Sequence, residues 1–203
     1  MSRLLPPDKA AIQTLPPFGG LGPAQIFLPG SAAELGAAWA ELSSQTHLGF
    51  DTEAKPVFVK GQLSSGPDLV QFATAHKAYL FQLRAPDCHE LVRRLLAAPQ
   101  IVKVGFDLQQ DQSQLQQRLG QPAMPVLDLV RVFHRRGYPR TIGIKSAVAI
   151  VFGQRFVKSK RVTTTNCANE RLEPRQLLYA ANDAWAALRV MQALGLSGDA
   201  PAA

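Results

Sequence analysis

Short apolar runs bounded by polar residues recur through the middle of the chain, and they predict β-strands. We expect strands at residues 47–51, 69–74, 78–83 and 101–104, with a brief one near Val126. A short segment containing His76 separates the second run from the third, which predicts a hairpin between them. The first three strands should therefore form a meander.

Apolar residues at intervals of three and four predict helices around these strands. Ser31 followed by Glu34 has the spacing of a capping box, Gly120 is a typical helix end, and Pro174 suits a first turn. We expect helices at residues 31–45, 86–97, 108–119 and 173–194, with a basic helical region before the last. Helices alternating with strands after a meander predict an α/β fold, with a mixed sheet of about five strands flanked by helices.

The chain has 203 residues, which is enough for one domain with a substantial core. Residues 1–24 are rich in proline and glycine and are expected to be extended or poorly ordered. The folded domain should span residues 25–195, and residues 196–203 should form a flexible tail. We find no internal repeats.

The strand predicted at residues 47–51 runs into two acids, Asp51 and Glu53. Residues two apart in a strand share a face and lie roughly 7 Å apart, so their carboxylates repel each other unless a cation lies between them. Such a pair is also common as a solvated strand end, and the pair alone does not decide between these interpretations.

Three further residues extend this hypothesis. Asp183 lies on the predicted long helix, and Tyr179 precedes it by one turn, so the two side chains should share a face. Asp111 lies in the first turn of the predicted helix 108–119. A tyrosine on a helix is also typical of core packing, and an acid in a first turn is also typical of a helix-dipole partner.

Composition indicates a soluble protein that binds a polyanion. The net charge is +7, and residues 130–168 contain nine lysines and arginines and no acid. Such a stretch attracts nucleic acid, although a solvated basic face is the alternative. Two cysteines give no disulfide framework, and the chain lacks a signal-peptide core or an apolar run of bilayer length, so we expect a cytoplasmic location and no membrane.

The ordered set of motifs resembles the DEDD superfamily of 3′-5′ exonucleases. The matching segments are FDTE around Asp51, GFDLQQD ending at Asp111, and YAANDA with Tyr179 and Asp183, over about residues 25–194. They are similar to the tyrosine branch, which includes ribonuclease D and the exonuclease domain of the Werner helicase. The resemblance implies a ribonuclease H-like fold and residues 25–195 as the exonuclease domain.

The resemblance also implies roles for these residues. Asp51, Glu53, Asp111 and Asp183 would bind two divalent cations, with Asp111 acting through water, and Tyr179 would orient the attacking water. Oxygen ligands favour Mg²⁺ or Mn²⁺. The expected reaction is hydrolysis at the 3′ end of single-stranded DNA or RNA, which releases nucleoside 5′-monophosphates.

Candidate contacts to nucleic acid are less specific. Phe106 could stack on the terminal base or belong to the core, and Lys55 could meet a phosphate or be solvated. Lys158, Lys160 and Arg161 lie in a segment that resembles the family pattern Lys-Ser-x-x-x-Ser-Asn-Trp, but Cys167 stands where tryptophan is expected. This departure puts local packing in question.

Two alternatives remain open: a nucleic-acid-binding module without turnover, and a phosphodiesterase restricted to very short oligonucleotides. The sequence leaves the choice between DNA and RNA open. It also leaves open the oligomeric state.

Overall fold

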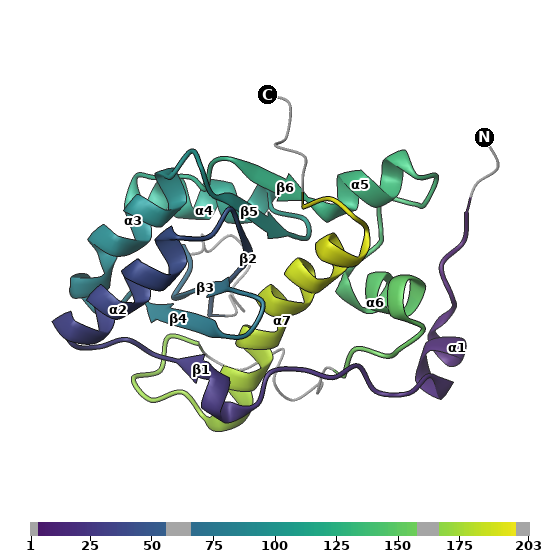
Figure 1. The fold of residues 1–203 in the computed structure, drawn as a ribbon, viewed down its shortest axis with the longest axis horizontal. Coiled ribbons are helices and arrows are strands. Elements are labelled where there is room, and N and C mark those ends of the chain that lie inside the picture. The colour runs from purple at the N-terminus through teal and green to yellow at the C-terminus, as the bar shows by residue number, and fades with distance from the viewer. Residues whose placement is uncertain (1–3, 56–65, 158–166, 198–203) are drawn as a thin grey trace, which may run out of the picture.

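The computed structural model describes residues 4–55, 66–157 and 167–197. Within them a single mixed sheet lies between two groups of helices (Figure 1). None of the helices in these ranges is long and apolar enough to cross a membrane.

The sheet has the order β1-β4-β3-β2-β5-β6. Its strands are β1 (Ile26–Phe27), β2 (His47–Glu53), β3 (Leu69–Ala73), β4 (Ala78–Gln82), β5 (Val102–Gly105) and β6 (Val126–Asp128). β2, β3 and β4 form the predicted antiparallel meander, and the remaining pairs are parallel. The predicted α/β class and mixed sheet are confirmed. β1 is the strand that the pattern missed, because two residues are too few to show alternation.

Most of the helices follow the predicted pattern. They are α1 (Lys9–Thr14), α2 (Ala32–Ser43), α3 (His89–Ala97), α4 (Gln109–Leu119), α5 (Leu129–Arg135), α6 (Ile144–Phe152) and α7 (Pro174–Ala193), with 3₁₀ turns at Pro23–Gln25 and Pro86–Cys88. The capping box forms, since the Ser31 hydroxyl accepts from Glu34 N at 3.3 Å and the Glu34 carboxylate accepts from Ser31 N at 2.9 Å. Gly120 ends α4 at a φ of 69°, a conformation that favours glycine.

Alternation along β2 divides the core into two layers. Leu48 and Phe50 face α2, α3 and α4 and join one apolar cluster with their residues. Gly49 faces the other way, against α7. On that second side the apolar residues of α5, α6 and α7 cover the sheet. The two acids of β2 alternate in step with Gly49, so they belong to the α7 side.

The N-terminal segment differs from the prediction. Residues 4–24 include α1, which Asp8 caps by accepting a 2.8 Å hydrogen bond from Ala11 N, so the segment is not extended throughout. Phe18 packs 5.6 Å from the Trp185 ring, and the Leu21 N–H donates to the side-chain oxygen of Asn182 at 2.7 Å. These anchors outweigh the local proline and glycine content. Of the predicted tail, residues 198–203 lie outside the described ranges.

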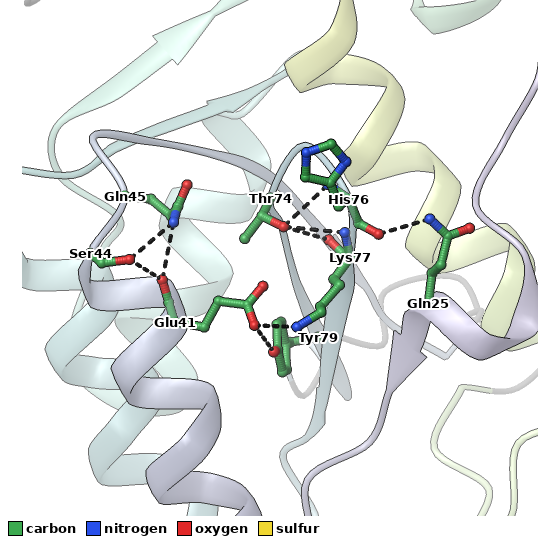
Figure 2. A network of polar contacts seen from close by, with 8 residues as sticks. All are labelled: Gln25, Glu41, Ser44, Gln45, Thr74, His76, Lys77 and Tyr79. Atoms are coloured by element: carbon green, nitrogen blue, oxygen red, sulfur yellow. Dashed lines mark hydrogen bonds and ion pairs between the residues drawn. The ribbon is translucent and has the colours of Figure 1, made fainter.

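A polar network ties α2 to the β3–β4 hairpin (Figure 2). Glu41 accepts from Lys77 Nζ at 2.6 Å and from the Tyr79 hydroxyl at 2.8 Å. His76 lies in the hairpin turn as predicted, and its carbonyl accepts from Gln25 Nε2 at 2.9 Å. The network fixes the outer edge of the sheet, next to β1.

Lys103 on β5 is fully buried, which is uncommon for lysine. Its ammonium donates to the carbonyls of Ile101 at 2.8 Å, Met124 at 2.6 Å and Ala98 at 3.2 Å. Burial disfavours the charged form and lowers the pKa of Lys103 to about 7. The three carbonyl contacts compensate part of this cost and hold β5 against the chain before β6.

The lowered pKa of Lys103 predicts pH-dependent stability. Between about pH 7 and about pH 10 the unfolded chain binds this proton and the folded chain does not, so the free energy of unfolding should rise with pH. Below pH 7 lysine is charged in both states and adds no further slope. Between pH 7 and pH 9, the free energy of unfolding measured in urea should rise more for the wild type than for Lys103→Met. An equal rise in both proteins would contradict the lowered pKa of Lys103.

Candidate active site

The close approach of α7 to β2 brings acids from distant parts of the sequence together. A Cβ atom built on Gly49 would lie 2.1 Å from the backbone oxygen of Ala184, so only glycine allows this contact. Asp183 immediately precedes Ala184, and Asp51 follows Gly49 by two positions on the same face of β2. The contact therefore sets the position of Asp183 over Asp51.

Asp51, Glu53 and Asp183 form a carboxylate group. One oxygen from each lies within 4.8 Å of the other two, and Asp183 is only 7% exposed. Three negative charges at this separation repel one another, and a divalent cation would offset the repulsion. Carboxylate oxygens are the ligands that Mg²⁺ and Mn²⁺ prefer, so the donor set fits these ions.

Gln71 adds a polar group that the sequence analysis missed. It pairs with Asp51 across the β2–β3 ladder and is fully buried. Within the described part of the chain, neither its amide nitrogen nor its amide oxygen has a hydrogen-bond partner. A buried amide in this state is expected to bind water or an ion's hydration shell. The sequence LVQFA did not indicate a role for Gln71, because every residue of β3 is buried and burial does not alternate along the strand.

Asp111 lies outside the carboxylate group. Its Oδ1 accepts a hydrogen bond from the Thr52 hydroxyl. Thr52 alternates with Asp51 and Glu53, so its side chain leaves β2 on the α4 side, where Asp111 lies in the first turn of that helix. Burial raises the pKa of Asp111, the Thr52 bond lowers it, and the nearby Asp107 and Asp128 raise it further. The structure thus gathers three of the four predicted acids, and a metal-binding role for Asp111 stays a prediction.

A cavity of about 430 Å³ opens beside the acids. Asp51, Asp183 and Phe106 line it, together with the start of α6 at Gly143, Ile144, Lys145 and Ser146. Phe106 is half-buried and stacks on Phe133 with ring centroids 6.5 Å apart. The cavity thus has an acidic wall, an aromatic wall and a basic helix start.

The start of α6 supplies features that the sequence did not single out as a site. Gly143 precedes the helix and has no side chain that could cap the first-turn N–H groups. Helix N-termini favour anions, and Lys145 is exposed in the same turn. The sequence feature that could have indicated this helix start is the absence of acids from residues 130–168.

Tyr179 lies one turn before Asp183 on α7, as predicted. It is half-buried and lines a different cavity, of about 350 Å³, with Phe18, Leu21 and Arg175 among others. The N-terminal segment therefore forms part of the wall beside Tyr179. No signal in residues 1–24 predicted this contact.

The remaining predicted residues are placed only in part. The side chain of Lys55 is exposed, and its backbone N–H donates to Asp68 at 2.8 Å. Lys158, Lys160 and Arg161 lie outside the described residues. Cys167, which stands where tryptophan was expected, is buried with Leu21 and Ala180, and burial raises the pKa of its thiol to about 12. It therefore fills core space and is not a reactive thiol.

Comparison with known proteins decides the family. A sequence profile described as 3′-5′ exonuclease matches residues 30–199. The chain belongs to this 3′-5′ exonuclease family. The match covers the whole sheet except β1 and includes Asp51, Glu53, Asp111 and Asp183, and it confirms the resemblance to DEDD exonucleases.

The exonuclease is also similar to individual proteins. It is 29% identical over 160 residues to the bifunctional 3′-5′ exonuclease/ATP-dependent helicase WRN of Mus musculus, with 78% of this chain and 11% of that protein covered. The chain thus spans about a tenth of this relative.

Solved structures share the fold at lower identity. The Nibbler EXO domain of Aedes aegypti superposes with a TM-score of 0.72 at 22% identity, covering 87% of this chain and 90% of that one. Ribonuclease D of Trypanosoma brucei in complex with RNA U12 superposes with a TM-score of 0.75 at 22% identity, covering 95% and 66%. These similarities confirm the predicted ribonuclease H-like fold.

Proposed function

We propose that the exonuclease uses divalent cations, belongs to the tyrosine branch, and removes nucleotides one at a time from the 3′ end of a single strand. The observation that supports this most strongly is the convergence of Asp51, Glu53 and Asp183 within 4.8 Å beside a cavity. The products would be nucleoside 5′-monophosphates.

Each residue has a role in this proposal. Asp51, Glu53 and Asp183 would hold the cations, and Asp111 would contribute through water. Bound cations would supply an activated water and stabilise the leaving 3′-oxygen. The Tyr179 hydroxyl would orient that water, Phe106 would stack on the terminal base, and Lys145 would contact the phosphate.

Two other functions are weighed against this one. A binding module without turnover would not need three carboxylates held against their mutual repulsion, so the carboxylate group favours hydrolysis. A phosphodiesterase for very short oligonucleotides would use the same acids, and only substrate length separates it from the proposal. The RNA present in the Trypanosoma brucei ribonuclease D complex supports a nucleic-acid substrate.

The proposal is tested with 5′-labelled 20-mers of matched DNA and RNA sequence. With Mg²⁺ or Mn²⁺ the label should move to a ladder of shorter products, and chelator should stop the reaction. The strand that is shortened at the higher rate is the preferred substrate. Retention of the full-length strand in the presence of metal would support the binding module instead.

Removing the hydroxyl of Tyr179 should slow the reaction without unfolding the protein. Tyr179→Phe keeps the half-buried ring, so the melting temperature should change little. Loss of one positioned hydrogen bond should lower kcat about ten- to a hundredfold and leave KM nearly unchanged. Single-turnover rates on the 20-mer measure this effect.

Tyr79→Phe is the matched control for this experiment. It also deletes a phenol, but at the Glu41 network on the far edge of the sheet (Figure 2). It should retain wild-type kcat. Equal rates for the Tyr179 variant and the wild type would remove Tyr179 from the proposed mechanism.

A further inference from the structure

We propose a second nucleic-acid site, the arginine pocket, which binds backbone phosphates of the strand 5′ to the terminal nucleotide. The pocket is a cavity of about 460 Å³ next to the active-site cavity. Its lining residues are Asp107, Gln109, Asp128, Val130, Arg131, His134, Arg135 and Arg140. The inference rests on the proposed exonuclease function and extends it to the path of the substrate.

Helical spacing gathers the basic side chains of the pocket. His134 and Arg135 follow Arg131 by three and four residues on α5, so both lie on the same face of that helix as Arg131. Arg140 comes from the loop that leads to α6 and completes the lining. All four side chains are exposed to solvent, where a strand can reach them.

The charges of the pocket favour an anion. Among the described residues, none of its three arginines forms an ion pair. Two acids, Asp107 and Asp128, also line the pocket, and its three arginines outnumber them. The Asp128 Oδ1 accepts from Val130 N at 2.9 Å and from Asp107 N at 3.2 Å. The Asp128 carboxylate thus already accepts two backbone hydrogen bonds, whereas the guanidinium groups of the arginines are available to bind phosphate oxygens in pairs.

The arginine pocket and the active-site cavity are lined by neighbouring residues of two chain segments. Phe106 lines the active-site cavity and the next residue, Asp107, lines the pocket. In the same way Gly143 lines the cavity and Arg140, three residues earlier, lines the pocket. Asp107 has a φ of 54°, so the chain turns at the step from Phe106, which lines the cavity, to Asp107, which lines the pocket.

This adjacency makes a strand a better occupant than a free nucleotide. A strand whose terminal base stacks on Phe106 would continue over the turn at Asp107 into the pocket. Proteins that bind single strands combine stacking aromatics with a basic groove along the backbone, and the two cavities together have this arrangement. The pocket therefore predicts that substrates longer than a dinucleotide bind more tightly.

The double variant Arg135→Gln/Arg140→Gln tests this inference. Anisotropy of a 5′-fluorescein 20-mer in chelator should show affinity about tenfold weaker than wild type. The slope of log affinity against log salt should fall by about one for each phosphate that the variant no longer binds. In metal, KM for the 20-mer should rise about tenfold, whereas cleavage of a dinucleotide, too short to reach the pocket, should be nearly unaffected.

The control is Arg94→Gln, which removes one arginine charge from α3, where the guanidinium lies 3.8 Å from the Trp39 ring centroid on the other side of the sheet. It should bind the 20-mer like the wild type. Unchanged 20-mer affinity in the double variant would overturn the proposal. So would an equal loss of affinity for a 5′-mononucleotide, which would make the pocket a mononucleotide site. Because binding is measured in chelator, an inactive wild type would count against the proposed function and leave this test decisive.

Discussion

Replacing Asp51 with asparagine is expected to abolish metal-dependent shortening of a 3′ end while leaving the fold intact. Asp51 is the member of the carboxylate group that also pairs with buried Gln71, at the centre of the sheet. Ions bound to carboxylates contribute several kcal/mol to stabilising charge in such transition states, so the rate should fall about a thousandfold or more. Rates on the labelled 20-mer in Mn²⁺ measure the loss.

The same variant should separate stability from metal binding. Without metal, Asp51→Asn should melt at or above the wild-type temperature, because one of three mutually repelling charges is gone. Adding Mn²⁺ should raise the melting temperature of the wild type and not that of the variant. Asp87→Asn, at an exposed carboxylate in the 3₁₀ turn before α3, should behave as the wild type in both measurements. Substantial activity in the Asp51 variant would contradict its assignment.

Replacing Gly49 with alanine should lower both stability and activity. The new methyl group would lie 2.1 Å from the Ala184 backbone oxygen, and backbone cannot move aside as a flexible side chain can. Overpacking of this kind costs about 1 to 3 kcal/mol, and α7 would have to shift away from β2. A displacement of about 1 Å at a reacting group can reduce the rate about a hundredfold, and Asp183 adjoins the contact. Urea unfolding and single-turnover rates measure the two effects.

Gly36→Ala is the matched control, because it makes the same chemical change on the exposed side of α2, where a Cβ meets nothing within 4 Å. That variant should be more stable by about 0.5 to 1 kcal/mol, since alanine favours a helix interior. Its rate should equal that of the wild type. A Gly49 variant with full stability and full activity would show that the contact does not position Asp183.

The parts of the fold that were predictable depend on local chemistry. Alternation in HLGFDTE identified the strand and put Asp51 and Glu53 on one face, and helical spacing put Tyr179 one turn from Asp183. The same alternation explains why Asp111 lies outside the carboxylate group. Thr52 points to the opposite side of β2 and holds Asp111 there, and the motif at Asp111 contains no information about this bond.

Other features depend on contacts between distant segments. The N-terminal segment packs on α7 through Phe18 and Leu21, whose partners Trp185 and Asn182 lie more than 160 residues away in sequence. The arginine pocket requires the turn at Asp107 and the loop at Arg140 to meet. Lys103 has the pattern of an ordinary strand residue, and only the fold brings its three carbonyl partners to it. Periodicity cannot indicate any of these, because each arises from tertiary packing.

The central claim is that Asp51, Glu53 and Asp183 bind divalent cations. Its most direct test is a crystal of the exonuclease soaked with Mn²⁺ and a nucleoside 5′-monophosphate, with anomalous diffraction recorded for manganese. We predict anomalous density in contact with oxygens of all three carboxylates, and its absence from a matched Asp51→Asn crystal. A well-ordered wild-type crystal with manganese bound elsewhere and none at these acids would contradict the claim.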